Sequence, residues 1–227
     1  MSTAPPPPPS GGTEIKPCFI VFEGIDGAGK STQAKLLARR MADLGIPVLL
    51  TAEPSDGPVG QIIRSLTTRL EAEEEARLFT EDRRDHVERV ILPSLAEGRT
   101  VICDRYVYSS VAYQGARGVD QAAILAAQRA FAPQPDVIFL LEISADIALA
   151  RIGSARRGGF STFEVREDLE AVDAVYRSIN DPAIKRIDGT SSSENIHSII
   201  MACLRELGCC NRAEHVVSAG EVVSNEC

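Results

Sequence analysis

The feature that most constrains the fold is a glycine-rich segment that directly follows an apolar run. Residues 18–22 are continuously apolar, and residues 24–31 read GIDGAGKS, which fits the spacing G-x-x-x-x-G-K-[ST]. Glycines let the backbone curl so that its N–H groups converge on phosphate oxygens. A helix that starts at such a loop points its positive end at the same anion. The segment therefore predicts a strand–loop–helix unit that binds nucleotide phosphates.

The two polar residues at the end of this segment have separate expected roles. Lys30 supplies a positive charge to the β- and γ-phosphates, and Ser31 offers its hydroxyl to magnesium. The loop alone does not identify a reaction, because GTPases, ATPases and small-molecule kinases share it. A GTPase would be expected to carry an N-K-x-D segment, and the sequence has none.

Apolar runs alternate with helical segments along the rest of the chain. Further strands are expected at 47–51, 100–103, 137–143 and 184–187, and helical spacing covers 31–44, 60–70, 73–97, 145–152, 164–179 and 194–207. Strands without polar alternation, separated by helices, indicate a parallel sheet covered on both faces. We therefore predict an α/β fold, a three-layer α/β/α arrangement around a five-stranded parallel sheet, with ligands at the carboxyl ends of the strands.

Charge and chain organisation exclude several functional classes. A net charge of −8 argues against a protein that coats nucleic acid. No apolar run approaches the roughly 20 residues of a membrane span, and the start of the chain has no apolar signal core. We expect a cytoplasmic protein without nucleic-acid or membrane partners. Residues 1–17, which include five consecutive prolines, predict a disordered leader, residues 18–208 one domain, and residues 209–227 a flexible tail.

The six cysteines are expected to be reduced. Cys18 and Cys103 fall within apolar runs, where cysteine behaves as a small hydrophobic residue. The other four lie on the predicted last helix or beyond it: Cys203, Cys209, Cys210 and Cys227. No C-x-x-C pair occurs, so a zinc site is not expected.

Further segments carry side chains suited to a nucleotide substrate. Asp104 follows the strand at 100–103, where a carboxylate can reach a magnesium shell, and Arg105 beside it can clamp a phosphate with its planar fork. Phe79 and Arg83 share one helix face and suit a planar base with a carbonyl edge. The alternative for Phe79 and Arg83 is an aromatic ring anchored in the core beside a solvated arginine. The alternative for Asp104 and Arg105 is an ion pair on the surface.

These segments occur in an order and spacing that resembles the thymidylate kinase family. The matching stretches are FIVFEGIDGAGKSTQ, FTEDRRDHVERVI, CDRYVYSSVAYQG and PDVIFLLEI, within residues 18–207. The resemblance implies a fold of P-loop kinase type and an enzyme that phosphorylates dTMP to dTDP with ATP and Mg²⁺, in dTTP synthesis, as a homodimer. Another P-loop deoxynucleotide or deoxynucleoside kinase is the alternative, and a nucleotide-binding module without turnover is the alternative from a different class.

The resemblance also implies roles for individual residues. Asp26 would hold the 3′-hydroxyl of the sugar, Phe79 would stack on thymine and Arg83 would donate to its O4 carbonyl. Tyr113 would leave no room for a 2′-hydroxyl, which would explain a preference for deoxy substrates. The expected dTMP-binding residues are Asp26, Glu53, Arg64, Phe79, Arg83, Arg105, Ser110, Tyr113 and Gln114. The expected ATP-binding residues are Gly24, Ile25, Asp26, Gly27, Ala28, Gly29, Lys30, Ser31, Thr32 and Arg151. The expected metal ligands are Ser31 and Asp104, and the expected catalytic residues are Lys30, Arg105, Arg156, Arg157 and Asp26.

A basic lid is expected to complete the site. Some family members carry an arginine where this chain has Gly27, and in members with glycine a basic lid neutralises the transition-state charge. Here the segment at about 151–161 contains Arg156 and Arg157 beside glycines, so both could swing in over bound phosphates. A solvated basic turn is the alternative, and the division of labour between the two arginines stays open. The chain departs from the family pattern at residues 161–162, where Asp-Arg is usual, and at Ala52, where arginine is common.

Overall fold

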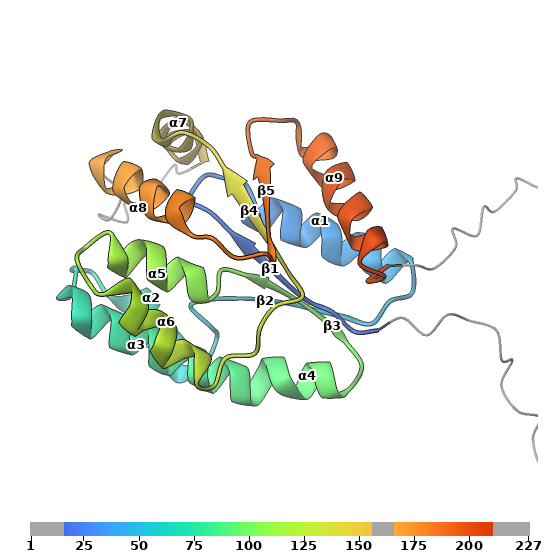
Figure 1. The fold of residues 1–227 in the computed structure, drawn as a ribbon, viewed down its shortest axis with the longest axis horizontal. Coiled ribbons are helices and arrows are strands. Elements are labelled where there is room, and N and C mark those ends of the chain that lie inside the picture. Colours follow the sequence, from blue (N-terminus) through green and yellow to red (C-terminus); the bar gives the residue numbers. More distant parts are fainter. Residues whose placement is uncertain (1–15, 156–165, 211–227) are drawn as a thin grey trace, which may run out of the picture.

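Five parallel strands form the centre of the protein, with helices on both faces (Figure 1). The structure is a computed structural model that describes residues 16–155 and 166–210. The strands are β1 (Phe19–Glu23), β2 (Val48–Ala52), β3 (Thr100–Asp104), β4 (Val137–Glu142) and β5 (Ile184–Asp188), and they lie in the order β2-β3-β1-β4-β5. The predicted α/β class and five-stranded parallel sheet are confirmed.

Helices pack against both faces of this sheet. They are α1 (Lys30–Asp43), α2 (Pro58–Ser65), α3 (Ala72–His86), α4 (Leu92–Ala96), α5 (Val107–Gly115), α6 (Gln121–Arg129), α7 (Ala145–Ala155), α8 (Arg166–Ser178) and α9 (Ser193–Glu206), with a π-helical turn η1 (Val87–Ile91) before α4. Helices α1 and α9 contact each other on one face, and α3 to α6 and α8 lie on the other (Figure 1). Among the described residues, no helix combines the length and the apolarity of a membrane span.

Burial explains why the apolar runs form the central strands. All five residues of β1 are buried, because β1 has a strand on either side and helices on both faces. Helix α1 instead buries one stripe, Ala34, Leu37 and Met41, whose spacing matches the helical period. This packing fixes the start of α1 against the end of β1, where the glycine-rich loop joins them.

The helical segment expected at 73–97 is interrupted near its end. The structure has the π-helical turn η1 directly before α4, which carries Pro93 in its first turn. Proline has no backbone N–H and its ring crowds the preceding turn, and a π turn is one way for a helix to accommodate it. The helix expected at 60–70 ends at Ser65, and α5 and α6 were not predicted.

The cysteines require a correction. Cys18 and Cys209 form a disulfide with their Cα atoms 5.9 Å apart, whereas Cys103, Cys203 and Cys210 are free. The expectation that all the cysteines are reduced is therefore wrong for this pair. Cys209 lies shortly after the end of α9 and is buried, and its neighbour in the chain, Cys210, is buried too. The segment expected to be a tail thus begins with two packed residues, and its remainder lies outside the described part of the chain.

We expect reduction of the Cys18–Cys209 disulfide to lower the stability of the protein, because the bridge joins residues 191 positions apart. A cross-link over so long a loop restricts the unfolded chain and typically contributes about 2–4 kcal/mol. Thermal unfolding followed by circular dichroism should give a lower midpoint in dithiothreitol. A variant with both Cys18→Ser and Cys209→Ser should show the low midpoint in either condition, whereas Cys203→Ser should keep the shift. Equal wild-type midpoints with and without reductant would contradict the bridge.

Candidate active site

The glycine-rich loop adopts a conformation that only glycine suits. Gly24, Gly27 and Gly29 have φ angles of 136°, 78° and 100°. A Cβ atom at Gly24 would lie 2.5 Å from the carbonyl oxygen of Leu141, and one at Gly27 would lie 2.8 Å from that of Ala148. The backbone angles therefore favour glycine at all three positions, and the available space also requires it at Gly24 and Gly27. The loop lies at the carboxyl end of the central strand, where the sequence predicted it.

Lys30 is the first residue of α1 and is turned inward toward the loop. Its side chain is 5% exposed, and Nζ donates a hydrogen bond of 2.8 Å to the carbonyl oxygen of Ile25. Burial, followed by the positive charge of Arg105, lowers the pKa of Lys30 to about 8. A triphosphate bound against the loop would supply the negative charge that favours the ammonium form.

The expected metal-binding pair lies side by side. Ser31 donates from its hydroxyl to Oδ2 of Asp104, the last residue of β3. Oδ1 of Asp104 is buried and, among the described residues, has no hydrogen-bond partner. A hydroxyl and a free carboxylate oxygen beside a phosphate loop are the hard oxygen ligands that Mg²⁺ prefers. The residues present therefore fit a magnesium ion.

A pocket of about 530 Å³, here called the loop pocket, opens above the loop. Arg151 of α7 also lines it, and its guanidinium donates to the carbonyl oxygens of Gly27 at 3.2 Å and Gly189 at 3.0 Å. The expected ATP-binding residues that line it are Asp26, Gly27, Ala28, Gly29, Lys30, Ser31, Thr32 and Arg151. Gly24 and Ile25 lie beneath them in the loop.

A second pocket of about 420 Å³, here called the aromatic pocket, adjoins the first. The expected substrate residues that line it are Asp26, Arg64, Phe79, Arg105, Ser110, Tyr113 and Gln114. Asp26 and Arg105 line both pockets. The two cavities therefore meet at an acid–base pair between the loop and the end of β3.

Arg105 is held rigidly at this junction. Its Nη2 donates to Oδ1 of Asp26 and, at 3.2 Å, to the hydroxyl of Tyr113, and Nη1 donates to Oγ of Ser109 at 3.3 Å. Its guanidinium also lies over the Tyr113 ring, 4.9 Å from the centroid. The φ of Arg105 is 73°, a conformation that a residue other than glycine adopts at a cost of about 1–3 kcal/mol. Such strain is typical of residues whose direction matters for function.

Arg83 points into the protein rather than into open space. Its side chain is 1% exposed and makes an ion pair with Glu53, with N–O distances of 2.6 and 2.8 Å. The same guanidinium donates to Oγ of Ser110 at 3.1 Å and to the carbonyl oxygen of Tyr106 at 2.8 Å. Ser110 lines the aromatic pocket, whereas Arg83 lies behind it. Arg83, the expected donor to the base, is thus already hydrogen-bonded to other protein groups, one of which is Glu53.

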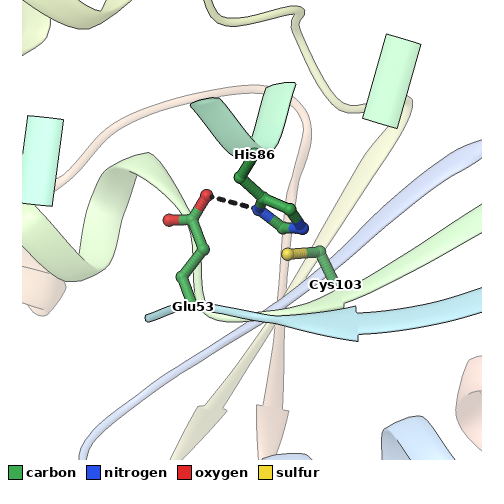
Figure 2. A group of neighbouring side chains, drawn as sticks. All are labelled: Glu53, His86 and Cys103. Carbon is green, nitrogen blue, oxygen red and sulfur yellow. Dashed lines mark hydrogen bonds and ion pairs between the residues drawn. The ribbon is translucent and has the colours of Figure 1, made fainter. Parts of the chain in front are cut away.

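Glu53 also belongs to a buried cluster of three polar side chains, together with His86 and Cys103 (Figure 2). Glu53 follows β2, His86 ends α3 and Cys103 belongs to β3. Nδ1 of His86 lies 3.1 Å from Oε1 of Glu53, and Nε2 lies 2.7 Å from Oγ1 of Thr51. The potential ligand atoms of the three residues lie within 4.8 Å of one another, which is compatible with a metal site.

The contacts of this cluster favour a supporting role over metal binding. Both carboxylate oxygens of Glu53 are occupied, one by Arg83 and one by His86. The thiol of Cys103 donates to the carbonyl oxygen of Arg105 at 3.0 Å, and burial raises its pKa well above the ordinary value. A metal would need the thiolate, which burial disfavours, and would break the contact between His86 and Oε1 of Glu53. The cluster therefore anchors Arg83 from behind.

The remaining predicted residues divide into those the structure describes and those it does not. Arg64 of α2 lines the aromatic pocket and donates to the carbonyl oxygen of Pro54 at 2.6 Å and to Asp56 at 3.1 Å. Residues 151–155 of the expected lid continue helix α7. The lid arginines lie outside the described residues: Arg156 and Arg157.

The sequence did not predict two acids beside the candidate site. Glu75, one helical turn before Phe79, lines the aromatic pocket. Glu23, at the end of β1, is buried and accepts hydrogen bonds from the hydroxyls of Ser109 at 2.6 Å and Tyr176 at 2.9 Å. Burial raises the pKa of Glu23. Glu75 could have been found from its position four residues before Phe79, which places both on one helix face. Glu23 could have been found because it is an acid at the end of an apolar strand.

Comparisons with known proteins agree with this geometry. A family model described as thymidylate kinase matches residues 22–200. A thymidylate kinase of Desulfotalea psychrophila is 42% identical over 192 residues, which cover 83% of this chain and 95% of the relative. A probable thymidylate kinase of Pyrococcus horikoshii is 43% identical over 198 residues, covering 82% and 95%. A thymidylate kinase of Akkermansia muciniphila is 42% identical over 193 residues, covering 84% and 93%.

Proposed function

The chain belongs to the thymidylate kinase family, and we propose that its two adjoining pockets hold ATP and dTMP so that the γ-phosphate passes from one to the other. It is an ATP-dependent dTMP kinase that forms dTDP. The observation that carries the proposed arrangement is that Asp26 and Arg105 line both the loop pocket and the aromatic pocket. Direct phosphoryl transfer requires donor and acceptor oxygens to meet in line, and a shared wall provides such a meeting point.

On the donor side, the loop would bind the triphosphate of ATP. Its backbone curls around three glycines, and the buried Lys30 would face the β- and γ-phosphates. Ser31 and Asp104 would hold Mg²⁺, which when bound neutralises charge on the phosphate oxygens. Oδ1 of Asp104, which has no hydrogen-bond partner in the part of the chain that the structure describes, supports this assignment.

On the acceptor side, the aromatic pocket would bind dTMP. Phe79 would stack on the base, Ser110 with Arg83 behind it would donate to the O4 carbonyl, and Tyr113 would close the space beside the sugar. The phosphate would be gripped by Arg64 and Arg105. No general base is needed, since a nucleoside monophosphate is already ionised at neutral pH and can attack directly.

The roles of the lid arginines and the homodimer are proposed chiefly from the sequence. We assign Arg156 and Arg157 to the neutralisation of transition-state charge, and measuring kcat for an alanine variant of each would show which one acts. A homodimer through residues 79–95 is compatible with Leu92, which is 44% exposed, and light scattering of the purified protein would decide it. A cytoplasmic location stays a prediction.

A panel of phosphate acceptors tests the substrate assignment. With ATP and Mg²⁺, release of ADP should show the highest kcat/KM for dTMP among dTMP, dUMP, dCMP, dGMP and thymidine. Removal of Mg²⁺ with EDTA should abolish turnover. A preference for thymidine would instead indicate a deoxynucleoside kinase, and binding of ATP with no turnover of any acceptor would indicate a regulatory module.

A further inference from the structure

Glu75 makes two polar contacts at the edge of the aromatic pocket that none of the roles above requires. It lies on α3 one turn before Phe79, and it lines the pocket. Its Oε1 accepts a hydrogen bond from Nε2 of Gln114 at 3.2 Å, and its Oε2 accepts from Nη1 of Arg117. Arg117 is in turn fixed by donating to the carbonyl oxygen of Leu70 at 2.5 Å. One carboxylate oxygen is therefore held by an arginine while the other faces an amide.

This contact determines which way the Gln114 amide points. An ionised carboxylate can only accept hydrogen bonds, so the NH₂ group of Gln114 must face Glu75. The amide oxygen then faces elsewhere as an acceptor. Gln114 is 1% exposed, and its Oε1 is buried without a hydrogen-bond partner among the described residues. A buried acceptor left unpaired costs about 1–3 kcal/mol, unless a ligand donates to it.

We propose that Glu75, held by Arg117, is a positioning residue that presents Oε1 of Gln114 to the N3–H of the base and so selects substrates with an imide edge. This inference rests on the proposed function and deepens it. Thymine and uracil carry an N3–H donor next to the O4 carbonyl. Cytosine carries an acceptor at N3 and an amino donor at C4, so its N3 lone pair would oppose the amide oxygen. A flipped amide would present NH₂ and reverse the preference.

Ser110, with Arg83 behind it, gives the aromatic pocket a second polar group that suits an imide edge. The guanidinium of Arg83 lies behind Ser110 and is anchored by Glu53, so this side of the pocket offers donors to a carbonyl oxygen. A fixed donor beside a fixed acceptor matches O4 and N3–H of an imide. Sites built to hydrogen-bond a ligand reject mismatched ligands strongly, because the mismatch leaves buried polar groups unpaired. The donor at Ser110 and the acceptor Oε1 of Gln114 should therefore exclude dCMP, but they should discriminate only weakly between dTMP and dUMP.

The test compares Glu75→Gln with Glu74→Gln, which makes the same change on an exposed residue of the same helix. The amide introduced by Glu75→Gln could either accept from or donate to Gln114, so the Gln114 amide would no longer have one fixed orientation. We expect Glu75→Gln to raise KM for dTMP about tenfold with kcat changed less than about threefold. The ratio of dTMP affinity to dCMP affinity, measured by calorimetry, should fall at least about tenfold. Glu74→Gln should match the wild type in all three quantities.

Two further variants keep the proposal open to refutation. Glu75→Asp retains an acceptor-only group and should keep part of the dTMP/dCMP ratio, which a merely structural role would not predict. If Glu75→Gln has a much lower thermal midpoint, Arg117→Met serves instead, because it removes the partner that holds the carboxylate. A folded Glu75→Gln or Arg117→Met variant with an unchanged dTMP/dCMP ratio would overturn the inference. Failure of the wild type to phosphorylate dTMP that it binds would overturn the proposed function alone.

Discussion

Lys30→Ala is expected to lower kcat by about 10²- to 10³-fold, the usual loss when one preorganised group that stabilises transition-state charge is removed. Lys30 is buried at the start of α1, and a charge developing on the transferred phosphate would meet its ammonium group with little water between them. Burial already lowers its pKa to about 8, which means that the fold disfavours the charge. The alanine variant should therefore retain a thermal midpoint near that of the wild type. Steady-state kinetics with saturating ATP and dTMP would measure the loss.

Lys35→Ala provides the matched control for this experiment. Lys35 lies on the same helix, is exposed, and loses the same charge on substitution. Its kinetic constants should stay within about twofold of the wild type, which would exclude a general effect of net charge. A folded Lys30→Ala variant with wild-type kcat would show that the loop does not neutralise the transferred phosphate.

The phosphate loop could be predicted in detail because everything it needs is local in sequence. Three glycines, a lysine and a serine lie within eight residues, and each role depends on its neighbours along the chain. The strand that precedes the loop was equally clear, because a strand buried on both faces is apolar throughout. These two elements also fix the edge of the sheet at which the site lies.

Helix α5 was missed because it carries no amphipathic pattern. Most of its residues are buried, including Tyr108, Ser110 and Gln114, so polar and apolar positions do not separate onto two faces. Helix α6 left a better signal. Asp120 precedes it, and its carboxylate accepts from the backbone N–H of Ala122, the usual contact of an N-cap residue.

Contacts between distant residues account for the rest of what the sequence did not reveal. Nothing near Cys18 indicates that its partner lies 191 residues away. The spacing of Phe79 and Arg83 predicted a shared helix face, but the position of Glu53 behind Arg83 depends on how β2 and α3 pack. The role proposed for Glu75 likewise depends on Gln114 arriving from another helix. Motif spacing therefore predicts which residues gather at a site, and packing decides which atoms they present.

Arg105→Lys is expected to lower kcat/KM for dTMP by about 10²-fold, although it keeps the positive charge. The guanidinium reaches Asp26, Ser109 and Tyr113 at once through two nitrogens, and a lysine ammonium cannot reproduce this planar fork. Each hydrogen bond to a charged group is worth about 1.5–3 kcal/mol, so losing the equivalent of one or two accounts for the expected factor. Initial rates at varied dTMP and fixed saturating ATP would measure it.

Arg177→Lys, the same exchange on an exposed residue of α8, should leave kinetics unchanged and serves as the control. Because Arg105 lines both pockets, its loss should raise KM for dTMP and also lower kcat, whereas a residue of only one pocket would change binding of one ligand. An Arg105→Lys variant in which only KM for ATP rises would assign the residue to the donor side. The wall shared by the two pockets would then no longer account for how the two phosphates are brought together.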